Sequence, residues 1–413
     1  MSVLQFFLLV LVSMSPLILS AAEPSAPSKP DPKITAEIQQ ILRETPLIDG
    51  HNDLPWQFRK RGGNPSAIDL RANNCQLKPA VVTDIPRLRA GGIGAQFWSV
   101  YVASEEPGPQ AVKAVLEQID VVYQIIARYP DTFELALTAA DIERIHRAGK
   151  IASLIGMEGG HSIDNSLSVL RMTYALGARY MTLTHTRNLD WADSANEEPK
   201  CHGLSPFGVQ VVQEMNRLGM LVDLSHVSDE TMRVALKVSK APVIFSHSSA
   251  RSVCNHVRNV PDDVLRLTAA NGGVVMVCFM PGFTSEPERA DLALRDKEEE
   301  RLKALDTNDE AAVEAGLAQW RKSHPAPPRA KLTDVADHID HIRKIAGVEH
   351  IGIGSDFDGF RGGIEGLEDV SCYPALLAEL IRRGYTKEEL KKIAGENLLR
   401  AMKEAEKVSR EMR

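Results

Sequence analysis

Short apolar runs of four to eight residues alternate with longer amphipathic stretches from residue 34 onward. Eight of these runs predict strands, at residues 46–50, 95–102, 151–157, 180–185, 220–225, 242–246, 273–279 and 350–354. The runs PVIFS and VVMVCF show no polar alternation, which is typical of strands covered on both faces. Strands and helices alternating in this order favour an α/β fold with a parallel sheet. Eight such units fit a (β/α)8 barrel of the TIM type, and an open doubly wound sheet is the alternative.

The stretch from residue 205 to 219 illustrates the helical signals between the predicted strands. Ser205 and Pro206 are residue types that cap and open a helix, and Gly219 is a type that ends one. Apolar residues between them recur at helical spacing, which predicts a stripe that faces the core.

One charged stretch interrupts the alternation. Residues 288–322 are highly charged and rich in Ala and Leu, and a Pro-rich turn follows at residues 324–328. This pattern predicts a solvated helical insertion, at about residues 284–330, within a single domain that spans residues 34–413. A lid or a subunit contact is the alternative role for the insertion.

The N-terminal segment predicts export. Residues 6–19 form a short apolar run, and the small residues Ser20, Ala21 and Ala22 follow it. This pattern predicts a signal peptide at residues 1–22 and a periplasmic or secreted protein. No Lys or Arg precedes the apolar run, so an uncleaved membrane anchor is the alternative. Residues 23–33 contain four prolines and predict a stiff linker.

Composition and charge narrow the class of protein. The chain of 413 residues is 44% hydrophobic and 25% charged, with a formal net charge of −7; these are ordinary values for a globular domain. No basic stripe is present, so nucleic acid is not an expected partner. The polar C-terminal segment KEAEKVSREMR differs from the apolar tail of a glycolipid-anchor signal, so no glycolipid anchor is expected.

Five cysteines are scattered along the chain, namely Cys75, Cys201, Cys254, Cys278 and Cys372. Because none of them forms a CxxC pair, a cysteine-based zinc site is not expected. Their odd number leaves at least one thiol free or paired between chains. A large core does not need disulfides, so we expect no essential one.

Metal-binding residue types recur where the predicted strands end. They are His51 and Asp53, Glu158, His185, His226, His247, and Asp356 with Asp358. In a parallel barrel these ends meet at one mouth, which is where active sites lie. Imidazole and carboxylate groups suit one or two divalent metals, zinc included. No GxSxG motif occurs and no GxGxxG motif follows a strand, so neither a nucleophile elbow nor a nicotinamide site is indicated.

Other polar residues have weaker predicted roles. His338 and His341 lie three apart on an amphipathic stretch, and we predict a pair on the surface of a helix. His161 is predicted to support the ligands from behind or to pack within the loop after Glu158, rather than to bind a metal itself. Asp223 and Ser225 are predicted to face away from the site or to support it.

These segments closely resemble the membrane dipeptidase family, also called renal dipeptidases, among the metal-dependent hydrolases with an amidohydrolase-like barrel. The matching motifs include DGHNDLPW at residues 49–56, ASLIGMEGGHSID at 152–164, TLTHTRN at 182–188, LVDLSHVS at 221–228, APVIFSHSSARSVCNHVRNVPDD at 241–263 and GSDFDG at 354–359. The resemblance covers about residues 34–402, which is nearly the whole predicted mature chain.

The resemblance implies two zinc ions per chain. His51, Asp53 and Glu158 would hold one ion, and Glu158, His226 and His247 would hold the other, so that Glu158 bridges them. By the same resemblance, Asp356 is the catalytic carboxylate that handles protons. His185 is expected to hold the substrate and the tetrahedral intermediate, and Arg258 to bind the C-terminal carboxylate of the substrate.

The expected function is that of a zinc-dependent dipeptidase in which a metal-bridging hydroxide attacks the peptide bond. The resemblance also implies tolerance of a D-residue at the C-terminal position of the dipeptide, and a homodimer. One alternative is a related two-metal barrel hydrolase that acts on a lactone, a phosphoester or a cyclic amide. A metal-dependent binding protein without catalysis is a further alternative.

Overall fold

The computed structural model of the protein describes residues 31–305, 310–360 and 362–413. The predicted signal peptide and residues 23–30 of the predicted linker lie outside these ranges. Within them, helix α1 (Pro32–Glu44) includes the last two residues of the predicted linker. Asp31 caps it by accepting a hydrogen bond from the backbone of Lys33 at 2.8 Å. Among the described helices, none combines the length and the apolar character needed to cross a membrane.

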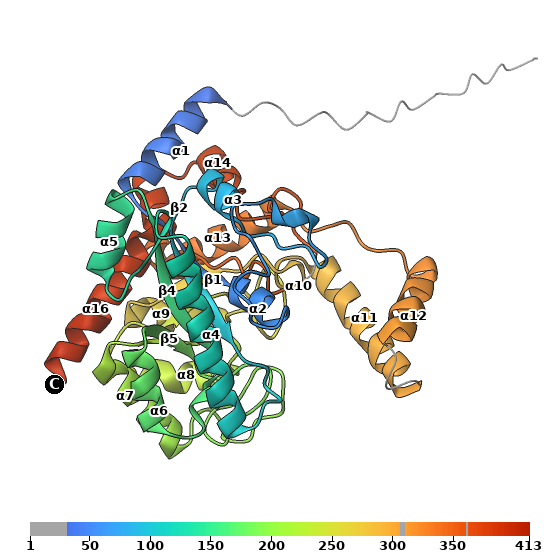
Figure 1. The fold of residues 1–413 in the computed structure, drawn as a ribbon, viewed down its shortest axis with the longest axis horizontal. Coiled ribbons are helices and arrows are strands. Elements are labelled where there is room, and N and C mark those ends of the chain that lie inside the picture. Colours follow the sequence, from blue (N-terminus) through green and yellow to red (C-terminus); the bar gives the residue numbers. More distant parts are fainter. Residues whose placement is uncertain (1–30, 306–309, 361) are drawn as a thin grey trace, which may run out of the picture.

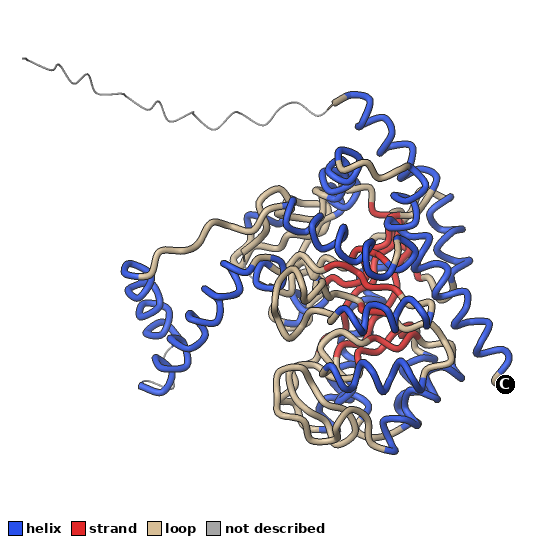
Figure 2. The backbone as a smooth tube through the Cα atoms, turned by 180° about the vertical axis from the view of Figure 1, so that it is seen from behind, coloured by secondary structure: helices blue, strands red, loops and turns tan. Residues whose placement is uncertain are grey.

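Eight parallel strands close into a barrel, which lies at the centre of the molecule in Figure 2. They are β1 (Leu47–Asn52), β2 (Ile93–Tyr101), β4 (Ile151–Glu158), β5 (Ala178–Thr182), β6 (Leu221–Asp223), β7 (Ile244–Phe245), β8 (Val274–Val277) and β9 (Ile351–Ile353). The ring closes because β2 pairs with β4 as well as with β1, while β9 joins β1 to β8. All eight predicted strands are present, and the closed ring excludes the open doubly wound sheet.

The short strand β3 (Phe133–Leu135) was not predicted from the sequence. It pairs with Ile151–Ser153 at the beginning of β4, below the point where β5 starts to pair at Ile155. The strand has three residues, of which only Phe133 is buried. A segment this short cannot show the alternation of apolar and polar residues that predicts a strand.

Helices surround the barrel (Figures 1 and 2). The main ones are α4 (Gly108–Arg128), α5 (Ala139–Arg147), α6 (Leu167–Ala175), α7 (Pro206–Leu218), α8 (Asp229–Val238), α9 (Asp262–Asn271), α13 (Leu332–Ala346), α14 (Tyr373–Arg382) and α16 (Asn397–Glu411). Helix α7 begins and ends as predicted: Ser205 accepts a hydrogen bond from Gly208, and Gly219 is left-handed at φ 82°.

The charged insertion forms a hairpin of two helices. After the short helix α10 (Pro281–Thr284), helices α11 (Glu286–Leu305) and α12 (Glu310–Ser323) project from the body of the molecule (Figure 1). Helix α11 contains no buried residue. Because α10 follows β8, the hairpin starts at the mouth where the strands end.

The prediction that His338 lies on a helix surface is wrong. Its side chain is fully buried on α13. Nδ1 accepts a hydrogen bond from the backbone of Ala250 at 2.9 Å, and Nε2 donates to the Thr284 carbonyl at 3.1 Å. The neighbouring His341 contacts Asp262 at 2.8 Å. The sequence could not reveal this, because both partners are backbone groups of segments distant in the chain.

All five cysteines are free in the structure. Cys254 and Cys278 are buried, whereas Cys75 is exposed.

Candidate active site

Four strand ends bring five metal-binding side chains into one cluster at the mouth of the barrel. His51 lies within the last residues of β1, Glu158 ends β4, and His226 and His247 follow β6 and β7. Asp53, directly after β1, completes the group. The ligand atoms of His51, Asp53 and Glu158 lie within 4.8 Å of one another, and so do those of Glu158, His226 and His247. All five residues are buried.

Glu158 lies between these two sets. Its Oε2 is 3.3 Å from His51 Nε2, while its Oε1 is 3.0 Å from His226 Nε2 and 3.5 Å from His247 Nε2. Ser99 donates a hydrogen bond to Oε2 at 3.0 Å and fixes the orientation of the carboxylate. Each oxygen therefore faces a different set of donors, which is the arrangement that a bridging carboxylate requires.

A tyrosine beneath the cluster orients His51. The Tyr180 hydroxyl lies 2.8 Å from His51 Nδ1 and donates to the Gly50 carbonyl at 3.2 Å. Because the hydroxyl proton is used in this way, Nδ1 of His51 is the donor and Nε2 presents its lone pair to the cluster. A Cβ at Gly156 would lie 2.0 Å from the Tyr180 ring, so this position must be glycine for the tyrosine to fit.

A buried carboxylate orients His247 in a similar way. Ser246 Oγ lies 2.8 Å from His247 Nδ1 and donates to Asp223 Oδ2 at 2.6 Å. The imidazole therefore donates from Nδ1 to the serine, and its Nε2 presents a lone pair to the cluster, 2.8 Å from His226 Nε2. Asp223 supports the site, one of the two roles allowed for it from the sequence. Ser225 also supports it, because its Oγ accepts the backbone N–H of His247 at 3.0 Å.

Two residues of the candidate site have left-handed backbones. His226 has φ 69° and Asp356 has φ 66°. Non-glycine residues rarely adopt this conformation, and such strain persists where the surrounding structure enforces it. Each residue lies three positions after the last residue of a strand, His226 after β6 and Asp356 after β9.

Asp356 and Asp358 differ although only two residues separate them. Asp356 Oδ1 lies 3.9 Å from His51 Nε2, and burial raises the pKa of this carboxyl well above its ordinary value. Asp358 lies away from the cluster: its Oδ1 accepts from the Val82 backbone at 2.8 Å, and its carbonyl accepts from Gln57 at 2.7 Å. It therefore anchors loops around the site.

His185 lies beside the bridging carboxylate, with Nε2 at 3.8 Å from Glu158 Oε1. Its Nδ1 is 3.0 Å from Ser104 Oγ, a residue of the loop after β2. His161 does not join the cluster. Its Nε2 donates to the Ala103 carbonyl at 3.1 Å, which agrees with its predicted packing within a loop.

Arg258 is buried close to the cluster. Its guanidinium donates to the His247 carbonyl and to Ser248 Oγ, both at 3.2 Å. Within the described part of the chain no carboxylate pairs with it, and its Nε has no hydrogen-bond partner. A buried, unpaired guanidinium is suited to bind the carboxylate of a ligand.

The electrostatics of the cluster favour metal binding. Burial lowers the pKa values of His226 and His247 well below the ordinary value, which keeps the imidazoles neutral. Burial opposes ionisation of Glu158, but His51 and His226 outweigh it, so the pKa of this carboxyl lies well below its usual range. His51 differs, because burial is outweighed by Tyr180, Glu158 and Asp53, which raise its pKa well above the ordinary value. A metal that binds at His51 would therefore displace a proton from it, whereas His226, His247 and Glu158 are already in the states that bind divalent metals.

Comparison with known proteins identifies the family. A model of the membrane dipeptidase family, peptidase family M19, matches residues 35–413. This chain belongs to the membrane dipeptidase family. Dipeptidase 3 of Rattus norvegicus is 42% identical over 383 residues, which cover 92% of this chain and 69% of the rat protein. Dipeptidase 3 of Mus musculus is 41% identical over 383 residues, with 92% and 68% covered. The predicted enzyme class, a metallodipeptidase, is thereby confirmed.

Solved structures share the fold of this dipeptidase. The probable dipeptidase PvdM from Pseudomonas aeruginosa aligns with a TM-score of 0.75 and 25% identity, and covers 91% of this chain and 99% of its own. A metallo peptidase from Rhodobacter sphaeroides, liganded with a phosphinate mimic of the dipeptide L-Ala-D-Ala, aligns with a TM-score of 0.70 and 23% identity, with 87% and 99% covered.

Several supporting residues escaped the sequence analysis. Tyr180 and Ser246 orient two of the histidines, and Ser104 contacts His185. Tyr180 and Ser246 are single polar positions in or beside apolar runs, and Ser104 lies in a loop. In the sequence, a polar residue within or beside an apolar run was the only signal, and it does not show which histidine the residue will contact.

Proposed function

We propose that this enzyme binds two zinc ions and hydrolyses dipeptides that carry a free C-terminal carboxylate. The observation that carries the proposal is the position of Glu158, whose two oxygens face separate donor sets at 3.0 to 3.5 Å. The nitrogen and oxygen donors of His51, Asp53, Glu158, His226 and His247 suit zinc. Bound in pairs, such ions lower the pKa of a water molecule toward about 7 and polarise the scissile carbonyl.

Asp356 is proposed to manage protons. It lies beside the cluster, 3.9 Å from His51, and is placed to accept a proton from the attacking water and to return it to the leaving nitrogen. Burial raises its pKa, whereas nearby cations would lower it. These opposing effects on the pKa would allow the carboxyl to gain and lose a proton during turnover.

His185 is proposed to stabilise the oxyanion. When Ser104 donates to Nδ1, the proton of the neutral ring lies on Nε2, the atom that faces Glu158 at 3.8 Å. Burial lowers the pKa of His185, so the ring is neutral at neutral pH and donates from this nitrogen. A fixed donor aimed at the developing charge stabilises the transition state more than the ground state.

Arg258 is proposed to select dipeptides by binding the C-terminal carboxylate with its unpaired guanidinium. The Rhodobacter sphaeroides structure, whose ligand mimics L-Ala-D-Ala, supports a D-residue at the C-terminal position. We also propose that residues 1–22 direct export, which places hydrolysis outside the cytoplasm.

Hydrolysis of a dipeptide panel by the mature protein tests the proposal. The panel pairs L- and D-residues at the C-terminal position and includes C-terminally amidated controls, with added zinc and with a chelator. We expect zinc-dependent cleavage of the free dipeptides and little cleavage of the amides. A zinc-loaded sample that cleaves none of the dipeptides would overturn the proposal, and lactones, phosphoesters and cyclic amides would be tried next.

A variant of Arg258 separates the dipeptidase from a related hydrolase. In Arg258→Gln we expect KM for dipeptides to rise by about 10- to 100-fold, because hydrogen bonds to a charged group are lost. Unchanged KM for dipeptides would remove Arg258 from the substrate site.

A further inference from the structure

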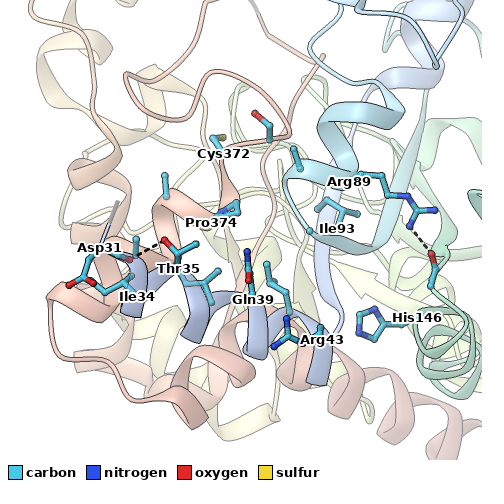
Figure 3. A pocket seen from close by; sticks show the side chains of 18 of the residues that line it. Asp31, Ile34, Thr35, Gln39, Arg43, Arg89, Ile93, His146, Cys372 and Pro374 are labelled. Atoms are coloured by element: carbon cyan, nitrogen blue, oxygen red, sulfur yellow. Dashed lines mark hydrogen bonds between the residues drawn. The ribbon is translucent and has the colours of Figure 1, made fainter. Parts of the chain in front are cut away.

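A cavity lies at the opposite end of the barrel from the cluster of candidate metal ligands. It is bounded by α1, by the turn between α3 (Ile85–Ala90) and β2, by the turn between α5 and β4, and by α14 (Figure 3). Ile93 and Lys150 line it, and they lie where β2 and β4 begin, whereas the metal-binding residues lie where strands end. None of the residues proposed for peptide hydrolysis lines this cavity.

The cavity is large enough for a small-molecule ligand. Its volume is about 1400 Å³, and ligand pockets commonly measure about 300–1,000 Å³. Its floor is apolar. Ile34, Ile38 and Leu42 recur every four residues on one face of α1, and Ile93 and Pro374 extend that surface.

The rim of the cavity is strongly cationic. Five basic side chains and a single carboxylate line it, namely Arg43, Arg89, Arg147, Lys150 and Arg382 against Asp31. Lys150 pairs with Glu134 at 3.1 Å, a carboxylate that it shares with Arg144, and Arg382 contacts Glu379. Among the residues that the structure describes, no carboxylate pairs with the other three arginines. The Arg89 guanidinium donates to the Gly149 carbonyl at 2.7 Å (Figure 3), which holds it beside the cavity.

We propose that this cavity binds an anionic amphiphile with a single alkyl chain, whose phosphate or carboxylate head contacts the arginine rim. The chain would lie on the apolar face of α1 and leave water, which is the favourable term for an alkyl group. Unpaired guanidinium groups bind phosphate and carboxylate in a two-pronged manner. A purely polar anion would not use the apolar floor, and a neutral lipid would not use the rim.

Isothermal titration with dodecyl phosphate, below its critical micelle concentration, tests the proposal on the metal-loaded mature protein. Dodecyl maltoside supplies the same chain without the charge, and inorganic phosphate supplies the head without the chain. We expect dodecyl phosphate to bind at least about tenfold more tightly than either control.

Two variants locate the binding. Arg89→Glu combined with Arg147→Glu reverses the charge of the rim, and Ala375→Trp fills the cavity from an exposed position on α14. Each is expected to weaken binding of dodecyl phosphate by at least about tenfold, while dipeptide hydrolysis and the thermal midpoint stay unchanged. Arg266→Glu, on the exposed face of α9, is the matched control and should bind as the wild type does.

Three results would overturn the proposal. One is equal binding of dodecyl phosphate and dodecyl maltoside, since the rim would then play no part. Another is wild-type affinity in both cavity variants, since the ligand would then bind elsewhere. The third is equal loss of binding in Arg266→Glu, which would indicate a general effect of net charge.

Discussion

The mouth of the barrel and the hairpin of α11 and α12 are both rich in charged residues, but they differ in burial and in partners. At the mouth, the five candidate metal ligands are buried and face one another. On α11 no residue is buried, and charges pair locally, as Glu298 does with Arg301 and Glu286 with Arg289. Exposed pairs at this spacing contribute little to stability.

The difference shows which charged residues carry chemistry. A charge such as that of Glu298 is compensated by a neighbour on the same helix turn and by water, so its loss costs little. A charge at the mouth is removed from water and compensated only by residues brought together by the fold, and such groups are retained where a ligand uses them. Local charge density alone would have favoured the hairpin.

Substituting the bridging carboxylate gives the largest expected effect. Glu158→Gln removes one anionic donor from both metal sets at once. We expect kcat/KM for a dipeptide to fall at least about 1,000-fold, because the two proposed metal ions would supply several kcal/mol of stabilisation. Metal content measured by mass spectrometry should fall with it.

The matched control is the same substitution on the hairpin. Glu298→Gln breaks an ion pair of similar chemistry with Arg301, and it should leave kcat/KM and metal content unchanged. Equal losses in the two variants would contradict the distinction between mouth and hairpin.

Substituting the residues that orient the candidate ligands is expected to have the next largest effect. In Asp223→Asn, an amide N–H₂ would replace the oxygen that accepts from Ser246. Ser246 would then donate to His247 Nδ1 and move the imidazole proton to Nε2, where the metal must bind. We expect zinc affinity to fall by about 10- to 100-fold, measured by titration with a competing chelator.

A second variant makes this prediction specific for one metal site. Tyr180→Phe removes the partner of His51 instead, so it should weaken the set of His51, Asp53 and Glu158. Loss of zinc from the same site in both variants would contradict the assignment of Tyr180 to one metal site and Asp223 to the other.

The fold and the site were predictable from the sequence to different degrees. Eight strands could be predicted because runs such as VVMVCF are apolar throughout, as expected for strands buried on both faces, and show no helical periodicity. The candidate ligands were found because strand ends of a parallel barrel converge. The orienting hydrogen bonds were not found: Asp223 and Ser246 meet only after β6 and β7 pair, and no local pattern records that contact.

The helical character of the insertion was predicted, but its division into two helices and the burial of His338 were not. Mixed charges and alanines predict helix over the whole insertion, but they do not indicate where it doubles back. The two ring nitrogens of His338 bond to the backbone of Ala250, in the loop after β7, and of Thr284, the last residue of α10. Helical periodicity placed His338 on an amphipathic helix but could not show which face would be covered.

His338 bonds to the loop that follows His247 at the mouth and to the last residue of α10, just before the hairpin. We expect the protonation of its imidazole to affect the stability of the fold. Burial lowers its pKa from 6.5 to about 4, so the unfolded chain binds a proton more readily than the folded one. Stability is therefore fully present above about pH 6.5 and is lost as the pH falls toward about 4, by up to about 3 kcal/mol.

Urea unfolding across this range measures the effect of His338. The variant His338→Gln cannot titrate there, so its unfolding free energy should fall less steeply with decreasing pH than that of the wild type. The wild type should still be more stable at neutral pH, because glutamine cannot reproduce both hydrogen bonds. Parallel pH profiles of the two proteins would show that other groups account for the acid sensitivity.

The smallest effect is expected on the hairpin itself. Leu294 on α11 is 54% exposed, so Leu294→Gln removes little buried apolar surface and should change the unfolding free energy by less than about 0.5 kcal/mol. Dipeptide hydrolysis should also be unchanged. A clear loss of activity with unchanged stability would mean that α11 contributes to the substrate site as a lid. A loss of stability that depends on protein concentration would instead mean that the leucine is covered by a second copy of the chain.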